Sequence, residues 1–235
     1  MARPWTILDR IDTDEGVLEL RQRGERDFLI TVGGVVLMNS MAHRTEVALG
    51  RIACRHLTTH PAPRVLIGGL GMGYTLRSVL DTLPDSARVT MAELNPVVAK
   101  WCKGPLASLT DSAITDPRVT IKITDVARLI RQCAVHGTIE RFDAIVFDLY
   151  TGPRTGAHKS NDPLYGNSAI DATRAALKPG GIFAVWGEDY DAGFEQRLRS
   201  ACFSVSTKRP GRGGPRHVVY VAALKNSRKQ NHQPR

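Results

Sequence analysis

Three acidic residues could form a polar site, because each one ends or closely follows a short apolar run. The runs cover residues 88–93, 118–123 and 142–147, and the acids are Glu93, Asp125 and Asp148. Such runs predict buried parallel strands, whose carboxyl ends meet at the edge where open α/β sheets bind ligands. Carboxylates there can accept hydrogen bonds from ribose hydroxyls or take a proton from a nucleophile. One such acid is often only a helix cap, as Asp125 could be, but three together indicate a site.

A glycine-rich turn earlier in the chain indicates what this site binds. Residues 65–67 predict another buried strand, and apolar residues at helical spacing follow the turn. Strand, glycine turn and helix open a nucleotide-binding βαβ unit, although a tight turn without a ligand is the simpler alternative. Glu93 follows Gly69 by 24 residues, close to the spacing at which an acid accepts from a ribose hydroxyl. The turn contains Gly68, Gly69, Gly71 and Gly73.

Composition narrows the class of protein. The 235 residues suit one α/β domain with a small appendage, and 42% hydrophobic and 23% charged residues are ordinary for a soluble protein. No apolar run approaches the roughly 20 residues that cross a bilayer, and the first residues lack an apolar signal core. We therefore expect a cytoplasmic protein without membrane contact. The four cysteines are scattered and form no Cys-x-x-Cys pair, which argues against disulfides and a zinc site.

Three parts are expected along the chain. Residues 1–42 form a short β element with a hairpin turn at Gly33-Gly34, residues 43–225 form the nucleotide-binding domain, and residues 226–235 form a disordered basic tail without apolar residues. The tail contributes to the net charge of +9. A solubilising role is the simpler interpretation. A patch for nucleic acid or an acidic partner is the alternative, less favoured because aromatic residues do not alternate with the basic ones.

These motifs together resemble those of class I S-adenosylmethionine (SAM)-dependent transferases, and most of all the spermidine-synthase-like branch. The resemblance rests on the order Gly68-Gly-Leu-Gly-Met-Gly73, Glu93, Asp125 and Asp148, with support from residues 75–77, 91–96 and 177–183. It implies an α/β fold with a Rossmann-like, doubly wound, seven-stranded sheet, to which a short N-terminal β-hairpin element is added. It also implies SAM or decarboxylated SAM as the donor, without a metal.

The resemblance assigns roles to single residues. The glycines would contact the donor, Glu93 its ribose, and Asp125 its adenine amino group. In spermidine synthases an aspartate at the end of the fourth strand orients the amine acceptor and takes its proton, and Asp148 occupies that position. Tyr150 is a candidate to assist Asp148 by hydrogen bonding, with packing as its alternative.

Candidates for binding the acceptor come from three other segments. A long stretch punctuated by glycine and proline, residues 149–165, is predicted to be a lid that closes on the acceptor. Three of the candidates have a simpler alternative: a solvated first helical turn for Glu46 and packing for Tyr165. For the acidic cluster of Glu188, Asp189 and Asp191, the alternative is that Asp189 or Asp191 caps the next helix. The resemblance implies a glutamate on the helix predicted at 43–57, and Glu46 is the match. The other candidates are Asp162 and Tyr165 in the lid, and Glu188 after the strand predicted at 182–186.

The sequence departs from aminopropyltransferases at two places. Gly71 stands where their glycine loop carries an acid that grips the donor's ammonium. The segment after Asp148 is shorter and lacks a second acid, for which Asp162 could substitute. Three functions stay open: aminopropyl transfer to a small-molecule amine, methyl transfer to another nucleophile (a small molecule rather than nucleic acid), and nucleotide binding without turnover. The short N-terminal element argues against the family's usual tetramer and leaves a homodimer open.

Overall fold

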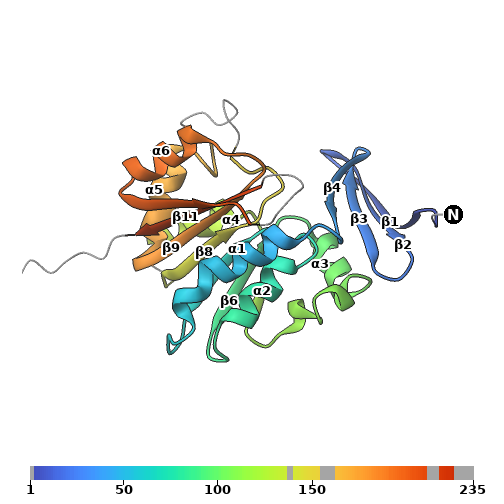
Figure 1. Cartoon of the computed structure of the whole chain (residues 1–235), viewed down its shortest axis with the longest axis horizontal. Coiled ribbons are helices and arrows are strands. Elements are labelled where there is room, and N and C mark those ends of the chain that lie inside the picture. The colour runs from blue at the N-terminus through green and yellow to red at the C-terminus, as the bar shows by residue number, and fades with distance from the viewer. Residues whose placement is uncertain (1–2, 137–139, 154–161, 211–216, 225–235) are drawn as a thin grey trace, which may run out of the picture.

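The computed structural model of the protein describes residues 3–136, 140–153, 162–210 and 217–224. A seven-stranded sheet forms the core of its main domain, with the N-terminal strands to one side (Figure 1). The expected tail at 226–235 and the middle of the predicted lid lie outside the described residues. The strands are ordered β10-β11-β9-β8-β5-β6-β7. In chain order they are β5 (Arg64–Gly68), β6 (Arg88–Glu93), β7 (Val119–Ile123), β8 (Phe142–Phe147), β9 (Leu177–Gly187), β10 (Phe203–Lys208) and β11 (Val218–Leu224).

The predicted doubly wound topology is confirmed. Strands β5 to β9 pair in parallel, whereas β11 pairs antiparallel with both β9 and β10. Within this sheet, β5 is the first strand along the chain, and β6 and β7 follow outward on one side of it. The chain then returns and places β8 on the other side of β5. Ligands bind such sheets at the carboxyl edge, where the winding reverses. The register pairs Gly68 of β5 with Phe147 of β8, so Gly69 and Asp148 come next at that edge.

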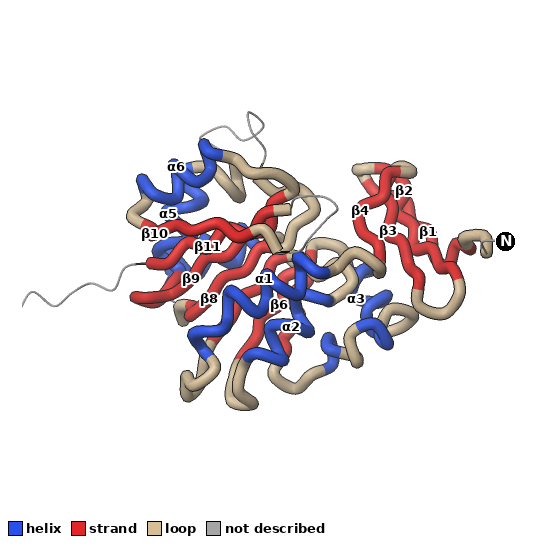
Figure 2. Tube along the Cα trace, in the orientation of Figure 1, coloured by secondary structure: helices blue, strands red, loops and turns tan. Residues whose placement is uncertain are grey.

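Helices cover both faces of this sheet (Figure 2). One face carries α1 (Arg44–Cys54), α2 (Tyr74–Thr82) and α3 (Pro96–Lys103), and the other carries α4 (Val126–His136), α5 (Asn167–Ala176) and α6 (Ala192–Ser200). The strands are therefore apolar on both sides, and every residue of β8 is buried. Single 3₁₀ turns lie at η1 (Arg55–Leu57), η2 (Ala107–Leu109) and η3 (Ala113–Thr115).

Two helices begin at residues of types that commonly cap helices. Asn95 Oδ1 accepts a hydrogen bond from the amide of Val97 at 3.0 Å, and Pro96 is the first residue of α3. Asp191 Oδ1 accepts from the amide of Phe194 at 2.9 Å at the start of α6. The capping interpretation is therefore correct for this member of the acidic cluster.

Strand β9 begins earlier than the sequence predicts. Residues 179–181 indicate a turn, but the strand already starts at Leu177. The partner of Phe142 is Leu177 and the partner of Ala144 is Ile182, so the intervening residues form an irregularity in the ladder. Gly180 there has φ +79°, which explains why glycine marks the position. The proline and glycines therefore bend the edge of a strand and do not precede it.

The N-terminal element is an antiparallel sheet of four strands, larger than a single hairpin. Its strands are β1 (Thr6–Thr13), β2 (Gly16–Arg23), β3 (Asp27–Val32) and β4 (Val35–Asn39). The two-residue turn at Gly33-Gly34 joins β3 to β4 as predicted, with φ of +55° and +81°. The sequence gives little sign of β1, because this edge strand has no buried residue and hence no apolar alternation.

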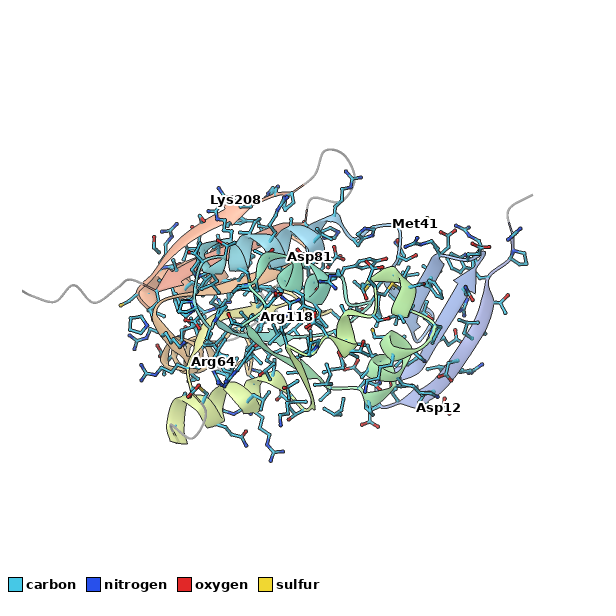
Figure 3. The ribbon with its side chains drawn as sticks, turned by 90° about the horizontal axis from the view of Figure 1, so that it is seen from below. Asp12, Met41, Arg64, Asp81, Arg118 and Lys208 are labelled. Carbon is cyan, nitrogen blue, oxygen red and sulfur yellow. The ribbon has the colours of Figure 1, made fainter. Side chains whose placement is uncertain are left out.

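This sheet packs against the side of the main domain that carries α3 (Figure 1). Leu20 and Phe28 belong to the same apolar cluster as Trp101 of α3. The indole Nε1 of Trp101 donates to Asp9 Oδ2 at 2.8 Å. Figure 3 shows that the two sheets lie at opposite sides of the molecule, since Asp12 of β1 is on one side and Lys208 of β10 is on the other. None of the helices in the described ranges is long and apolar enough to cross a membrane.

Candidate active site

The glycine turn joins β5 to α2 at the point where the sheet order reverses. Gly69 has φ +89°, and a Cβ there would overlap the carbonyl oxygen of Asp148, so only glycine fits. The amide of Asp148 in turn donates to the carbonyl oxygen of Gly68 at 2.9 Å. Gly73 precedes the first residue of α2, which therefore begins beside this contact. The turn and the end of β8 thus form one backbone unit.

Glu93 ends β6 with a buried carboxylate that faces the same turn. Its Oε2 accepts a hydrogen bond from the amide of Leu70 at 2.9 Å, and its Oε1 accepts from the amide of Asn95 at 2.8 Å. Each carboxylate oxygen can accept a further bond. The group can therefore hold the turn in place and still accept from a ribose hydroxyl.

Two apolar side chains beside this acid were not singled out by sequence reasoning. Leu94 follows Glu93 and is 72% exposed, and Ile123 ends the neighbouring strand and is 49% exposed. Large exposed apolar residues at a ligand-binding edge offer surface to a flat aromatic ring. The signal that could have found Leu94 is its place directly after a strand-ending acid.

Asp148 and Glu46 come together although 102 residues separate them in the sequence, as 148 minus 46. Thr75 links them from the first turn of α2: its Oγ1 donates to Asp148 Oδ2 at 2.6 Å and lies 3.2 Å from the carbonyl oxygen of Glu46. The first turns of α1 and α2 therefore meet over the end of β8. From the sequence alone, Thr75 serves only as support for the resemblance and is assigned no role at the site.

Burial raises the pKa of both carboxyl groups. The pKa of Asp148 rises to about 6, with the hydrogen bond from Thr75 opposing the rise. The pKa of Glu46 rises to about 7, first through burial and second through the negative charge of Asp148. The two groups repel when both are ionised, so they titrate as a pair near neutral pH. Such a pair can accept a proton from a nucleophile at that pH.

The first turn of α1 is held from the N-terminal side. His43, just before α1, stacks on Tyr74 of α2 with ring centroids 4.0 Å apart and planes 11° from parallel. Both rings contact the carbonyl oxygen of Ser40, at 2.8 Å from the His43 Nδ1 and 3.1 Å from the Tyr74 hydroxyl. Burial raises the pKa of Tyr74, so its hydroxyl stays protonated and can donate. This cluster sets the position of Glu46.

Met38 of β4 occupies the space beside Gly71. The amide of Met72 donates to the Met38 Sδ at 3.3 Å, and a Cβ on Gly71, which has φ +51°, would lie 2.9 Å from that sulfur. A side chain at position 71 would therefore need both an unusual backbone and a displaced Met38. The N-terminal sheet thus supplies a thioether where a loop acid would otherwise lie.

Three other residues that were predicted to act on the acceptor or bind it are Tyr165, Tyr150 and Glu188. Tyr165 is fully buried, packs edge-on against Phe147 and donates from its hydroxyl to the carbonyl of Thr151 at 2.9 Å, which favours the packing alternative. Burial, followed by the charges of Asp162 and Asp148, raises its pKa. Tyr150 is 55% exposed. Glu188 is exposed just beyond β9. Their roles towards an acceptor stay predictions.

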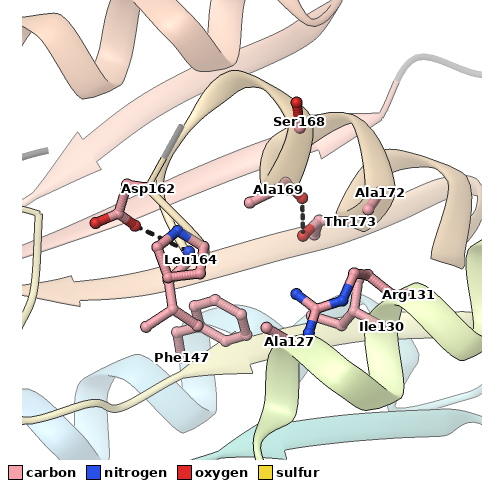
Figure 4. A pocket seen from close by; sticks show the side chains of 11 residues that line it. Ala127, Ile130, Arg131, Phe147, Asp162, Leu164, Ser168, Ala169, Ala172 and Thr173 are labelled. Atoms are coloured by element: carbon pink, nitrogen blue, oxygen red, sulfur yellow. Dashed lines mark hydrogen bonds between the residues drawn. The ribbon is translucent and has the colours of Figure 1, made fainter. Parts of the chain in front are cut away.

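Asp125 caps α4, since its Oδ1 accepts from the amide of Ala127 at 2.8 Å. Its role towards adenine stays a prediction. A cavity of about 290 Å³ lies beside this helix, between α4 and α5. Figure 4 shows Arg131 of α4, Asp162 and Leu164 around it. The Asp162 Oδ1 accepts from the amides of Leu164 and Tyr165 at 2.9 and 2.7 Å, which shapes the start of the loop into α5.

The fold and the site together define a class I SAM-dependent transferase fold: a doubly wound sheet with a glycine turn at its reversal point and acids after neighbouring strands. A family model described as the spermine/spermidine synthase domain matches residues 51–196, which is more than half of the chain. The chain therefore belongs to the spermine/spermidine synthase domain family. Within the described ranges, no group of three metal-ligating His, Cys, Asp or Glu side chains occurs.

Individual relatives agree with this assignment. Polyamine aminopropyltransferase 1 of Hyperthermus butylicus is 34% identical over 129 residues, which cover 54% of this chain and 41% of that protein. Polyamine aminopropyltransferase 1 of Pseudomonas aeruginosa is 34% identical over 121 residues, covering 52% and 38%. The chain thus spans about two fifths of the length of these relatives. Spermidine synthase from Thermotoga maritima shares the fold, with a TM-score of 0.70 at 22% identity over 94% of this chain and 73% of that one.

Proposed function

We propose that this chain transfers an aminopropyl group from decarboxylated SAM to a small-molecule amine. The observation that carries the proposal is the carboxyl pair of Asp148 and Glu46, which Thr75 joins beside the glycine turn. Burial raises the pKa of Asp148 to about 6 and that of Glu46 to about 7. Family membership and the names of the relatives support the same reaction.

The residues fit such a donor. The glycine turn lies at the N-terminus of α2, where backbone amides can bind a ligand, and Glu93 offers carboxylate oxygens for the ribose. When bound, decarboxylated SAM supplies an electrophilic carbon next to its sulfonium. The chain must hold the acceptor nitrogen in line with that carbon. A nitrogen–carbon bond forms as the carbon–sulfur bond breaks, and 5′-methylthioadenosine leaves.

Asp148 acts on the acceptor in this proposal. A cationic amine is attracted to the carboxyl pair, but only its neutral form has the lone pair that attacks. Asp148 orients the nitrogen and takes the proton that the nitrogen loses. Glu46, whose pKa is raised partly by the charge of Asp148, is the second carboxyl group that attracts the cationic amine. A pKa near 6 lets the ionised form of Asp148 predominate at neutral pH while it remains basic enough to bind a proton.

The decisive experiment is product analysis by mass spectrometry. The protein is incubated with a panel of amines and either decarboxylated SAM or SAM. We expect 5′-methylthioadenosine and an aminopropylated amine from the first donor, and neither from the Asp148→Asn variant. Formation of S-adenosylhomocysteine from the second donor, without aminopropyl transfer, would establish methyl transfer instead. Binding of either nucleotide without any product would indicate a non-catalytic role.

A further inference from the structure

A tryptophan and a histidine lie beside Asp148 on the α1–α2 side of the sheet. Phe147 of β8 pairs with Val185 of β9, so Asp148 and Trp186 follow as neighbours at the carboxyl edge. Phe147 and Val185 both point into the apolar cluster under α4 to α6. Side chains alternate along a strand, so the next residues point to the opposite face. Trp186 accordingly packs against the other cluster, under α1 and α2.

His217 lies next to Trp186 and directly precedes β11, the strand that pairs with β9. Trp186 pairs with Val219, the second residue of β11. The rings of Trp186 and His217 have centroids 4.9 Å apart and planes inclined by 36°. Asp148, Trp186 and His217 therefore lie side by side at the carboxyl edge of the sheet, and Thr75 links Asp148 to Glu46.

Both rings have a buried nitrogen without a hydrogen-bond partner among the residues that the structure describes. These atoms are Trp186 Nε1 and His217 Nδ1. The rings lie close but do not satisfy each other. An indole N–H can only donate, and a buried donor without an acceptor is destabilising and uncommon in proteins. An oxygen or another acceptor atom next to Trp186 Nε1 would satisfy this N–H.

We propose that Trp186 and His217 bind an oxygen of the acceptor molecule. This inference rests on the proposed function and narrows its substrate class. An ammonium group offers no hydrogen-bond acceptor to an indole N–H, so a plain diamine cannot satisfy Trp186. The acceptor is an amine that also carries a hydroxyl, carbonyl or carboxylate oxygen. Asp148 and Glu46 hold the amine, and the two rings hold the oxygen.

The test compares acceptors of equal chain length by calorimetry on the protein saturated with 5′-methylthioadenosine. The probes are 1,4-diaminobutane, 1,4-diaminobutan-2-ol and ornithine, which add no oxygen, a hydroxyl and a carboxylate respectively. We expect at least one oxygen-bearing probe to bind about tenfold or more tightly than 1,4-diaminobutane. Equal or tighter binding of the plain diamine than of both others would overturn the proposal, as would the absence of binding by all three.

Two variants locate the preference. Trp186→Phe keeps an aromatic ring but removes the N–H, and the ratio of affinities should fall to about one. Trp101→Phe is the matched control, because its indole N–H is satisfied by Asp9 in the contact with the N-terminal sheet. It should keep the wild-type ratio, even if its melting temperature falls. An unchanged ratio in Trp186→Phe would overturn the assignment, and if that variant does not fold, the wild-type comparison still decides.

The experiment separates this inference from the proposed function. Affinity is measured without turnover. The preference for oxygen-bearing probes can therefore be determined whichever group the protein transfers. If the protein binds S-adenosylhomocysteine but not 5′-methylthioadenosine, the proposed aminopropyl transfer fails. The three probes are then compared on the complex with S-adenosylhomocysteine, and the same ratios apply.

Discussion

The hydroxyl of Thr75 donates to Asp148 Oδ2 at 2.6 Å. This contact ties the first turn of α2 to the end of β8 and stabilises the ionised carboxylate. Burial acts in the opposite direction and raises the pKa of Asp148 to about 6. The balance between burial and the hydrogen bond from Thr75 sets the pH range in which Asp148 can take a proton. Substitution of Thr75 changes the hydrogen bond alone.

Asp148→Asn should lower turnover by about 100-fold or more, because an amide cannot take the proton of the acceptor. The fold and the affinity for 5′-methylthioadenosine should be retained, as judged by the melting temperature and calorimetry. Asp143→Asn is the matched control on the same strand. Asp143 accepts from the amide of Arg64 and from Lys178 Nζ, each at 2.8 Å, so its loss should lower stability more than turnover. An active Asp148→Asn enzyme would remove Asp148 from the mechanism.

Thr75→Val should move the acidic limb of the pH–rate profile to higher pH. The hydrogen bond from Thr75 lowers the pKa of Asp148, so its removal lets burial raise that pKa further. At a given pH on this limb, a larger fraction of Asp148 is then protonated, and the rate is lower. Thr75→Ser keeps the hydroxyl and should retain the wild-type limb. Identical profiles for valine and serine would mean that the hydroxyl does not tune the base.

Glu46→Gln should alter how stability depends on pH. The pKa of Glu46 rises from 4.5 to about 7 in the folded protein, first through burial. Folding therefore favours the protonated form, and this stabilisation is full below about pH 4.5 and is lost as the pH rises through about 7. The free energy of unfolding of the wild type relative to Glu46→Gln should be higher at pH 5 than at pH 8 in urea titrations. A difference that is constant with pH would argue against a raised pKa.

Glu93→Ala should weaken nucleotide binding by about 10- to 150-fold, since charge-assisted hydrogen bonds contribute roughly 1.5–3 kcal/mol. The variant should also melt earlier, because the amides of Leu70 and Asn95 lose their acceptor. Asn95→Ala separates the two effects. It removes the cap of α3 and should lower the melting temperature while leaving nucleotide affinity close to that of the wild type. Unchanged affinity in Glu93→Ala, measured by calorimetry, would exclude a ribose contact.

Gly71→Asp should be destabilised, because the backbone has φ +51° and Met38 fills the space. Combining it with Met38→Ala removes the obstruction and should recover part of the lost melting temperature. In competition binding, the folded double variant should shift preference towards decarboxylated SAM by roughly 5- to 150-fold relative to Met38→Ala alone. The new acid pairs with the donor's ammonium and repels the carboxylate of SAM. A double variant that folds but shows no shift would mean that position 71 does not face that end of the donor.

Much of the fold could be predicted because it depends on local patterns. The continuous apolar runs identify the parallel strands, and the glycines and the acids after the strands identify the ligand-binding edge. Asn95 and Asp191 cap helices as their residue types suggest. Strand β1 was not predicted because none of its residues is buried, and two of its three half-buried residues, Asp9 and Thr13, are polar.

The candidate site could be predicted only where residues adjoin these motifs. Asp148 and Glu93 end strands, and Glu46 was placed by resemblance alone. Met38, Trp186 and His217 reach the site from other strands, and no local pattern distinguishes a residue that packs in a core from one that faces a ligand. Their positions depend on strand pairing and on how the N-terminal sheet docks, neither of which a sequence displays directly.

The sulfur of Met38 joins the N-terminal sheet to the turn that would surround the donor, and Trp101 joins the same sheet to α3. We therefore expect the small sheet and the glycine turn to open as one cooperative unit. Local opening of β4 should then expose the amide of Met72 to exchange with solvent deuterium. A ligand bound at the glycine turn should then slow exchange in β3 and β4 as well.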